Sequence, residues 1–198
     1  CDQLEPELQE RCWGGAFMEN STSSTNRDHP TVWLKESDKF YPCTQLNEQY
    51  LNQCYFYQSN YLIMKTDHNF PSVFNDCYTL PNSHKDYCVM GVGASLASLA
   101  NETSIEKAAS VCNIAKSGSR NICIEGAIPS MMQRWGGQAQ KIIEFCQITG
   151  RDLRSLCFAK LGYVYESWQG EKKLEDFCKE LKSFKNDCLG KSQVKLTY

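Results

Sequence analysis

The sequence lacks the features that mark several large classes of protein. No apolar run approaches the roughly 18 residues that a membrane-spanning helix needs, so we expect no membrane span. Lysine and arginine number 21 against 23 acidic residues, and this balance gives no basic footprint for a nucleic-acid partner. We also expect a folded rather than a disordered chain, because 41% of the residues are apolar and 22% are charged.

Catalytic and metal-binding motifs are missing as well. The chain has no G-x-S-x-G, no H-E-x-x-H and no phosphate-binding loop motif. Its three histidines, at 29, 68 and 84, are scattered, and no C-x-x-C pair provides the spacing of a structural zinc site. We therefore expect no metal and no cofactor. His84 falls in a predicted turn, where we expect a solvated side chain rather than a catalytic base.

Cysteine is what the sequence has in excess, with twelve in 198 residues. The cysteines form six close pairs: Cys1 and Cys12, Cys43 and Cys54, Cys77 and Cys88, Cys112 and Cys123, Cys146 and Cys157, Cys178 and Cys188. Ten residues separate the members of five pairs and nine those of the sixth, and the first members follow one another by 42, 34, 35, 34 and 32 residues. A fixed period in this range is typical of repeat proteins. One complete pair in each repeat predicts six disulfides within repeats, and a metal array is the alternative.

Oxidised cysteines predict an extracellular or periplasmic protein. Two sequons, at Asn20 and Asn101, permit glycosylation in a eukaryotic secretory route. A lipid anchor on Cys1 is an alternative to its disulfide. The register of Cys1 with the other first cysteines favours the disulfide with Cys12.

Apolar residues before several first cysteines follow a helical period. Stripes with the spacing i, i+3, i+4 and i+7 predict helices over 70–77, 105–112 and 139–146, and Leu174 to Leu181 makes a similar face. A second helix should start near each second cysteine, as over about 152–168. Small residues in these second helices predict close helix–helix approach, with room for a ligand as the alternative; they are Gly14, Gly15, Ala16, Gly91, Gly93, Ala94, Gly126 and Ala127. Pro129 should kink or shorten its helix.

These patterns predict an all-α fold, an α-solenoid of about six cysteine-paired helix-turn-helix repeats. We expect one domain over 1–191, with units around 1–42, 43–76, 77–111, 112–145, 146–177 and 178–191. The polar stretch 20–32 should be a surface loop. We expect residues 192–198 to form an extended tail, in which the alternation of Val194, Leu196 and Tyr198 predicts a strand. Pairing with a second copy is the preferred role of that strand; covering a groove on the solenoid, leading into a further domain, or simply fraying are the alternatives.

One segment carries a family resemblance. The run Leu161-Gly162-Tyr163-Val164-Tyr165, followed by Gly170, Leu174, Phe177 and Cys178, resembles a Sel1-like or tetratricopeptide-type helix pair. Cysteine-rich Sel1-like proteins also join helical pairs by regular disulfides. The resemblance is strongest over 153–182 and architectural over 43–152. It implies an α-solenoid with an interaction role, and it transfers no catalytic or binding residue.

Aromatic and methionine side chains supply the candidate binding residues, which are Trp13, Tyr57, Tyr61, Met131 and Trp135. They predict a groove for a peptide or a glycan, and packing between repeats is the alternative. We therefore expect a secreted helical-repeat module, without catalytic residues, that binds protein or peptide partners. An extracellular glycosidase-like hydrolase using carboxylates such as Glu19, Glu125 and Glu166 is one alternative, and a subunit of a cell-surface assembly is another.

Overall fold

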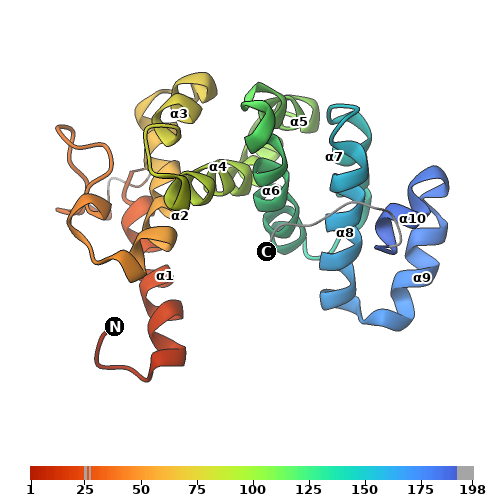
Figure 1. Ribbon diagram of the computed structural model, residues 1–198, viewed down its shortest axis with the longest axis horizontal. Coiled ribbons are helices and arrows are strands. Elements are labelled where there is room, and N and C mark those ends of the chain that lie inside the picture. Colours follow the sequence, from red (N-terminus) through yellow and green to blue (C-terminus); the bar gives the residue numbers. More distant parts are fainter. Residues whose placement is uncertain (25, 27, 191–198) are drawn as a thin grey trace. The chain divides into compact units, whose positions relative to one another are not determined.

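A computed structural model describes residues 1–24, 26 and 28–190 of the chain. The prediction of an all-α fold is confirmed, because the described part contains ten α-helices and no strand longer than a single bridge between Lys35 and Asp38 (Figure 1). The α-helices are α1 (Pro6–Thr22), α2 (Glu48–Lys65), α3 (Phe70–Cys77), α4 (Asn82–Glu102), α5 (Ile105–Ile114), α6 (Arg120–Arg134), α7 (Ala139–Ile148), α8 (Arg154–Gln169), α9 (Glu171–Lys179) and α10 (Lys185–Cys188). Short 3₁₀ helices cover Cys43–Gln45, Ser117–Ser119 and Lys182–Phe184.

The predicted apolar stripes form helices α3, α5 and α7, and their apolar faces are buried. Side chains also define where two of these helices begin. Asn69 accepts a hydrogen bond from the backbone N–H of Ser72, and Ser104 accepts one from that of Lys107. Each oxygen satisfies a backbone donor that a helix start leaves without an intrahelical partner.

Six disulfides join the end of one helix or turn to the start of the next. The bridges are Cys1–Cys12, Cys43–Cys54, Cys77–Cys88, Cys112–Cys123, Cys146–Cys157 and Cys178–Cys188, with Cα–Cα separations of 5.5 or 5.6 Å. This is the pairing that the spacing predicts, and it leaves no free cysteine. The protein therefore has the chemistry of an oxidising compartment.

The chain divides into two compact units, and the boundary falls within α4, between Val92 and Gly93. In the first unit α1 packs against α2, and α2 packs against α3. The largest buried side chains of this unit are Phe17, Phe40, Tyr55, Leu62, Ile63, Phe70, Val73 and Phe74.

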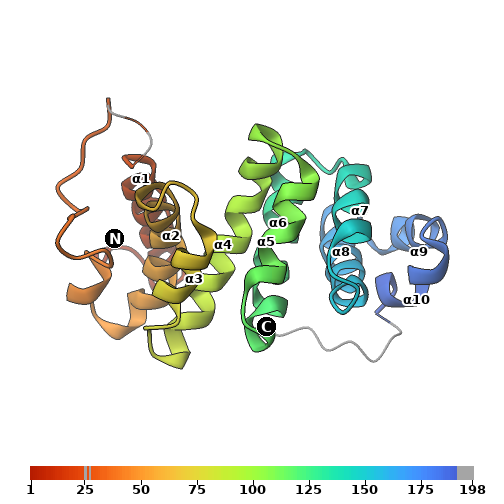
Figure 2. The same cartoon turned by 90° about the horizontal axis from the view of Figure 1, so that it is seen from above.

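In the second unit, α5 packs against α6 and α7, and α6 packs against α7 and α8. Helices α7 and α8 lie side by side in both views of the chain (Figures 1 and 2), and α8 also contacts α9 and α10. The core of this unit is built from Leu96, Ile124, Ile128, Met131, Met132, Ile142, Phe145, Leu153, Phe158 and Leu161.

Close helix–helix approach explains two of the glycines singled out in the sequence. A Cβ at Gly91 would overlap the backbone carbonyl of Phe56, and a Cβ at Gly93 would overlap that of Cys123. By contrast, a Cβ at Gly15 would meet no atom within 4 Å. The sequence analysis missed Gly162, whose Cβ would overlap the carbonyl of Cys188.

The structure corrects the expected helix ends at two places. Pro129 does not shorten α6, which continues to Arg134, because Ile128, Met131 and Met132 on either side of the proline are buried and hold this part of the helix in the core. The polar stretch 20–32 is not wholly a surface loop, since α1 runs to Thr22. Among the described helices, none is both long enough and apolar enough to cross a membrane. The tail at 192–198 lies outside the described residues.

Candidate functional site

The loop between α1 and α2 contains a segment that several helices hold in place. We call residues 31–42 the anchored loop. Gln58 of α2 is only 3% exposed, and its side-chain nitrogen donates hydrogen bonds to the backbone carbonyls of Lys39 at 2.9 Å and Tyr41 at 3.0 Å. One buried amide therefore satisfies two carbonyls of a segment that has no regular secondary structure of its own.

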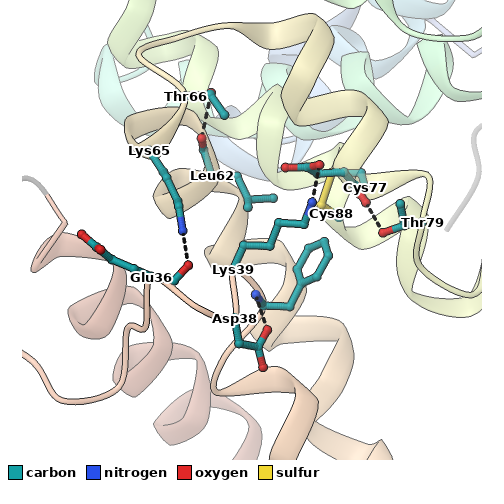
Figure 3. A network of polar contacts seen from close by, with 11 residues as sticks. Glu36, Asp38, Lys39, Leu62, Lys65, Thr66, Cys77, Thr79 and Cys88 are labelled. Carbon is teal, nitrogen blue, oxygen red and sulfur yellow. Dashed lines mark hydrogen bonds and ion pairs between the residues drawn. A yellow bond between two sulfur atoms is a disulfide. The ribbon is translucent and has the colours of Figure 1, made fainter.

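Further polar side chains, two donors from α2 and an acceptor from α3, hold the same segment. Lys65 donates to the carbonyl of Glu36 at 2.7 Å, and the Tyr61 hydroxyl donates to that of Lys35 at 3.3 Å. Figure 3 shows Lys39 extending from the loop toward the Cys77–Cys88 bridge, where its ammonium group pairs with Asp76. These contacts join the loop to two helices and place it beside a disulfide.

Helix α1 contributes a third set of contacts through Asn20. The Asn20 amide donates to the carbonyl of Trp33 at 3.3 Å and accepts from the Thr31 hydroxyl at 2.8 Å. The hydroxyl of Thr31 in turn accepts from the N–H of Trp33 at 3.1 Å. The backbone at Trp33 is thus held from both its N–H and its carbonyl.

The anchored loop buries Phe40 but exposes two other apolar side chains. Val32 is 78% exposed and Trp33 is 55% exposed. The Trp33 ring stacks on Tyr41 with 6.1 Å between centroids, and the Lys35 ammonium group lies 3.7 Å from the Tyr41 ring centroid. A fixed backbone that presents an exposed indole, an aliphatic side chain and a cation has the composition of a protein-binding surface.

The anchored loop carries charges of both signs, since the exposed Glu36 follows Lys35 directly in the sequence. Lys39 is paired with Asp76, and Asp38 accepts from the Phe40 N–H and the Thr44 hydroxyl. In the described part of the chain, no carboxylate lies within ion-pair distance of Lys35 or Lys65. Their ammonium groups instead lie over the rings of Tyr41 and Tyr61, respectively.

Replacing Gln58 by leucine should loosen the anchored loop. Leucine fits a similar volume but leaves the carbonyls of Lys39 and Tyr41 without their donor, which costs about 2 kcal/mol for buried polar groups. We expect faster hydrogen exchange over 33–42 and a lower free energy of unfolding. Gln45→Leu is the control, because Gln45 is exposed and bonds only the neighbouring Thr44 carbonyl. Equal exchange in the two variants would contradict the anchoring role of Gln58.

A second polar and aromatic cluster lies near the start of the chain. The Asp2 carboxylate accepts hydrogen bonds from the Tyr50 hydroxyl at 2.6 Å and from the Trp13 indole N–H at 3.1 Å. These bonds, that of Tyr50 first, lower the pKa of Asp2 because they favour its charged form. Trp13 also packs on Tyr50, with 4.7 Å between centroids, and on Phe17. The cluster therefore ties the first residues to α1 and α2.

His84 is buried, which corrects the expectation of a solvated turn residue. It is 5% exposed, lies in the first turn of α4 and stacks on Tyr55. Its Nδ1 lies 3.0 Å from the Asn52 amide oxygen and its Nε2 lies 3.2 Å from a Glu48 carboxylate oxygen. Both ring nitrogens thus have partners on α2, and His84 links α4 to that helix.

The second unit has a hollow of about 340 Å³ between α4 and α6. Its lining is Ala94, Ala97, Ser98, Ser130, Gln133 and Arg134. The small side chains follow from the close approach at Gly93, where the two helix backbones nearly touch. The lining has a single charged group, that of Arg134, so the hollow lacks the paired groups that acid–base chemistry needs.

The five candidate groove residues are divided between the two units and differ in burial. Trp13, Tyr57 and Tyr61 are half-buried in the first unit, and Tyr61 supports the anchored loop. Met131 is 0% exposed and Trp135 is 6% exposed, so both are core residues of the second unit rather than an accessible surface. Packing decides their position, because Met131 of α6 and Trp135, which follows that helix directly, are both covered by the rest of the unit.

Sequence analysis missed Val32, Trp33 and Lys35, the exposed members of the anchored loop. The available signal was the apolar run Val-Trp-Leu at 32–34. It begins at the last residue of the polar stretch 20–32. The run has neither the helical nor the strand period that would place its side chains on one buried face. Asn20 bonds the backbone of this run at Trp33, and Gln58 bonds the loop farther on at Lys39; both partners lie more than ten residues away in the sequence.

The carboxylates considered for a hydrolase have different surroundings. Glu19 is exposed and lies 3.6 Å from His29, whereas Glu125 is 3% exposed within α6. Glu166 is half-buried on α8. Within residues 1–24, 26 and 28–190, no three histidine, cysteine or acidic side chains are grouped as a metal site would require.

Comparison of the chain with models of protein families, with curated proteins and with solved structures finds no match. Its function is therefore argued from its own residues.

Proposed function

We propose that the protein is an extracellular binding module for protein or peptide partners, and that the anchored loop is its contact surface. The observation that carries the proposal is the exposure of Val32 and Trp33 on a backbone fixed by three helices. A surface ordered before binding loses little conformational entropy when a partner arrives. The indole of Trp33 is the expected anchor, since tryptophan is enriched among residues that dominate binding energy.

The expected partner is an extended acidic segment with at least one apolar side chain. Lys35 and Lys65 offer two ammonium groups without a carboxylate partner in the described chain. An apolar side chain of the partner would cover Trp33 and Val32, while its carboxylates approach the two lysines. Complementary charge at Lys35 and Lys65 would speed association with such a partner.

Repeated stacking of helical pairs, with the chain as an α-solenoid, is part of the same proposal. Equivalent contacts in successive cysteine-paired repeats support it. Arg120 and Arg154 each stand three residues before a second cysteine, and each donates at 3.2 Å to the carbonyl three residues after the matching first cysteine. Gly93 and Gly162 each stand five residues after a second cysteine and face the carbonyl of the next one, Cys123 or Cys188. Recurrent contacts between neighbours are typical of helical repeat proteins.

Selection from a random peptide library displayed on phage tests the binding function. We expect the oxidised protein to enrich peptides that combine aromatic or aliphatic residues with aspartate or glutamate. Trp33→Ala should weaken binding of an enriched peptide about tenfold or more, as the loss of a central aromatic anchor does. The measurement is the dissociation constant in solution.

Trp168→Ala is the matched control for the loss of an exposed indole. Trp168 is 48% exposed on α8 in the second unit, close to the 55% of Trp33. We expect its replacement to leave peptide binding unchanged. Equal losses in the two variants, or no enrichment over a helical protein of similar charge, would reject the proposed function.

A further inference from the structure

We propose that Asn101 is an N-glycosylation site of the folded protein and that Asn20 is not. Both asparagines head an N-x-S/T sequon. The two amide groups have different surroundings, so the same motif has a different outcome at each position. The inference rests on the secretory part of the proposed function and is independent of the anchored loop as a binding surface.

Asn101 is accessible and lies where the chain turns. It is exposed in the last turn of α4, and the sequon Thr103 follows that helix, just before Ser104 caps α5. Its Oδ1 accepts a hydrogen bond from the Trp135 indole N–H at 2.9 Å. No residue in the described chain accepts a hydrogen bond from its Nδ2. The nitrogen that would carry the glycan is therefore not used by the fold.

The chemistry of transfer leaves the Trp135 contact intact. A bond forms between Nδ2 and the anomeric carbon of a lipid-diphosphate-linked oligosaccharide. The bond from that carbon to the diphosphate oxygen breaks, the diphosphate leaves with the electron pair, and Nδ2 loses one proton. The amide carbonyl is unchanged, so Oδ1 remains an acceptor for the Trp135 indole, which is itself buried.

Asn20 uses both ends of its amide to hold the anchored loop. It is half-buried in α1; its Nδ2 donates to the Trp33 carbonyl at 3.3 Å and its Oδ1 accepts from Thr31 at 2.8 Å. A sugar on Nδ2 would have to occupy the space between α1 and the loop. One proton remains on Nδ2 after transfer, so the conflict is steric: the sugar would displace the loop at Trp33, and we expect Asn20 to be unoccupied in the folded protein.

The test is site occupancy in protein secreted from a eukaryotic host. The folded, monomeric fraction is treated with a peptide amidase that converts glycosylated asparagine to aspartate in heavy-oxygen water, and peptides are mapped by mass spectrometry. We expect label at Asn101 and none at Asn20. An unlabelled Asn101, or label at Asn20 in the folded fraction, would overturn the inference.

Matched variants keep the result interpretable if one change affects folding. Thr103→Ala removes the sequon while retaining the Asn101 amide and its bond to Trp135, so we expect complete loss of the glycan with the fold preserved. Asn101→Asp also retains an oxygen acceptor for Trp135 and should behave in the same way. Thr22→Ala removes the other sequon and should leave the glycan mass unchanged; a lower mass in that variant would contradict the assignment to Asn101.

Discussion

Replacing Gly93 by alanine is expected to lower the free energy of unfolding by about 3 kcal/mol, at the upper end of the usual cost of overpacking. The added Cβ would overlap the carbonyl oxygen of Cys123, which belongs to the backbone of α6 and cannot rotate away. The two helices must then separate, and the buried contacts of Ile124 and Ala127 are loosened with them. Chemical denaturation of the oxidised protein measures the effect.

Gly15→Ala is the matched control and should change stability in the opposite direction. It also lies in a helix, but a Cβ there meets nothing within 4 Å. Alanine is a better helix former than glycine by about 1 kcal/mol, so we expect a gain of up to that size. If both substitutions stabilise the protein, α4 and α6 do not approach each other at Gly93 as closely as the structure shows.

Removal of the Cys112–Cys123 bridge should cost about 3 kcal/mol. The disulfide closes a short loop between α5 and α6, and the chain-entropy model gives that value for a loop of this size. Both cysteines are 0% exposed, so the double replacement by alanine also removes buried sulfur contacts. The loss should be local, because the bridge holds only one helical pair. Hydrogen exchange should accelerate over 105–134.

The Cys1–Cys12 bridge provides the comparison for a local effect. Its two residues lie in the first unit, and Cys1 and Cys12 are both more exposed than Cys112 and Cys123. The Cys1→Ala, Cys12→Ala double variant should accelerate exchange near α1 and leave 105–134 unchanged. Uniform acceleration along the chain in either variant would show that the bridges do not act on separate helical pairs.

The parts of the fold that could be predicted from sequence depend on short-range patterns. The cysteine pairs are ten or eleven residues apart, and the stripes of α3, α5 and α7 each fit within two turns of helix. Such short-range patterns can be recognised without information about residues elsewhere in the chain. Trp168 marks their limit, since this large apolar side chain lies at the end of the helix predicted over about 152–168 but is 48% exposed.

The candidate site could not be predicted in the same way, because its contacts join distant residues. Gln58 reaches Lys39 across 19 positions, and Lys39 reaches Asp76 across 37. His84 is buried for a similar reason, since its partner Asn52 lies 32 residues away. A polar residue becomes buried when its partners are brought to it, and this depends on tertiary packing rather than local pattern.

The central claim is that partners bind at the anchored loop, and hydrogen exchange with and without a selected peptide tests it most directly. The account predicts that added protection is confined to residues 31–42 and to the facing part of α2 around Tyr61 and Lys65, and that Trp33→Ala removes it. Protection centred instead on the hollow lined by Ala97 and Arg134, with exchange in the anchored loop unchanged, would contradict the account.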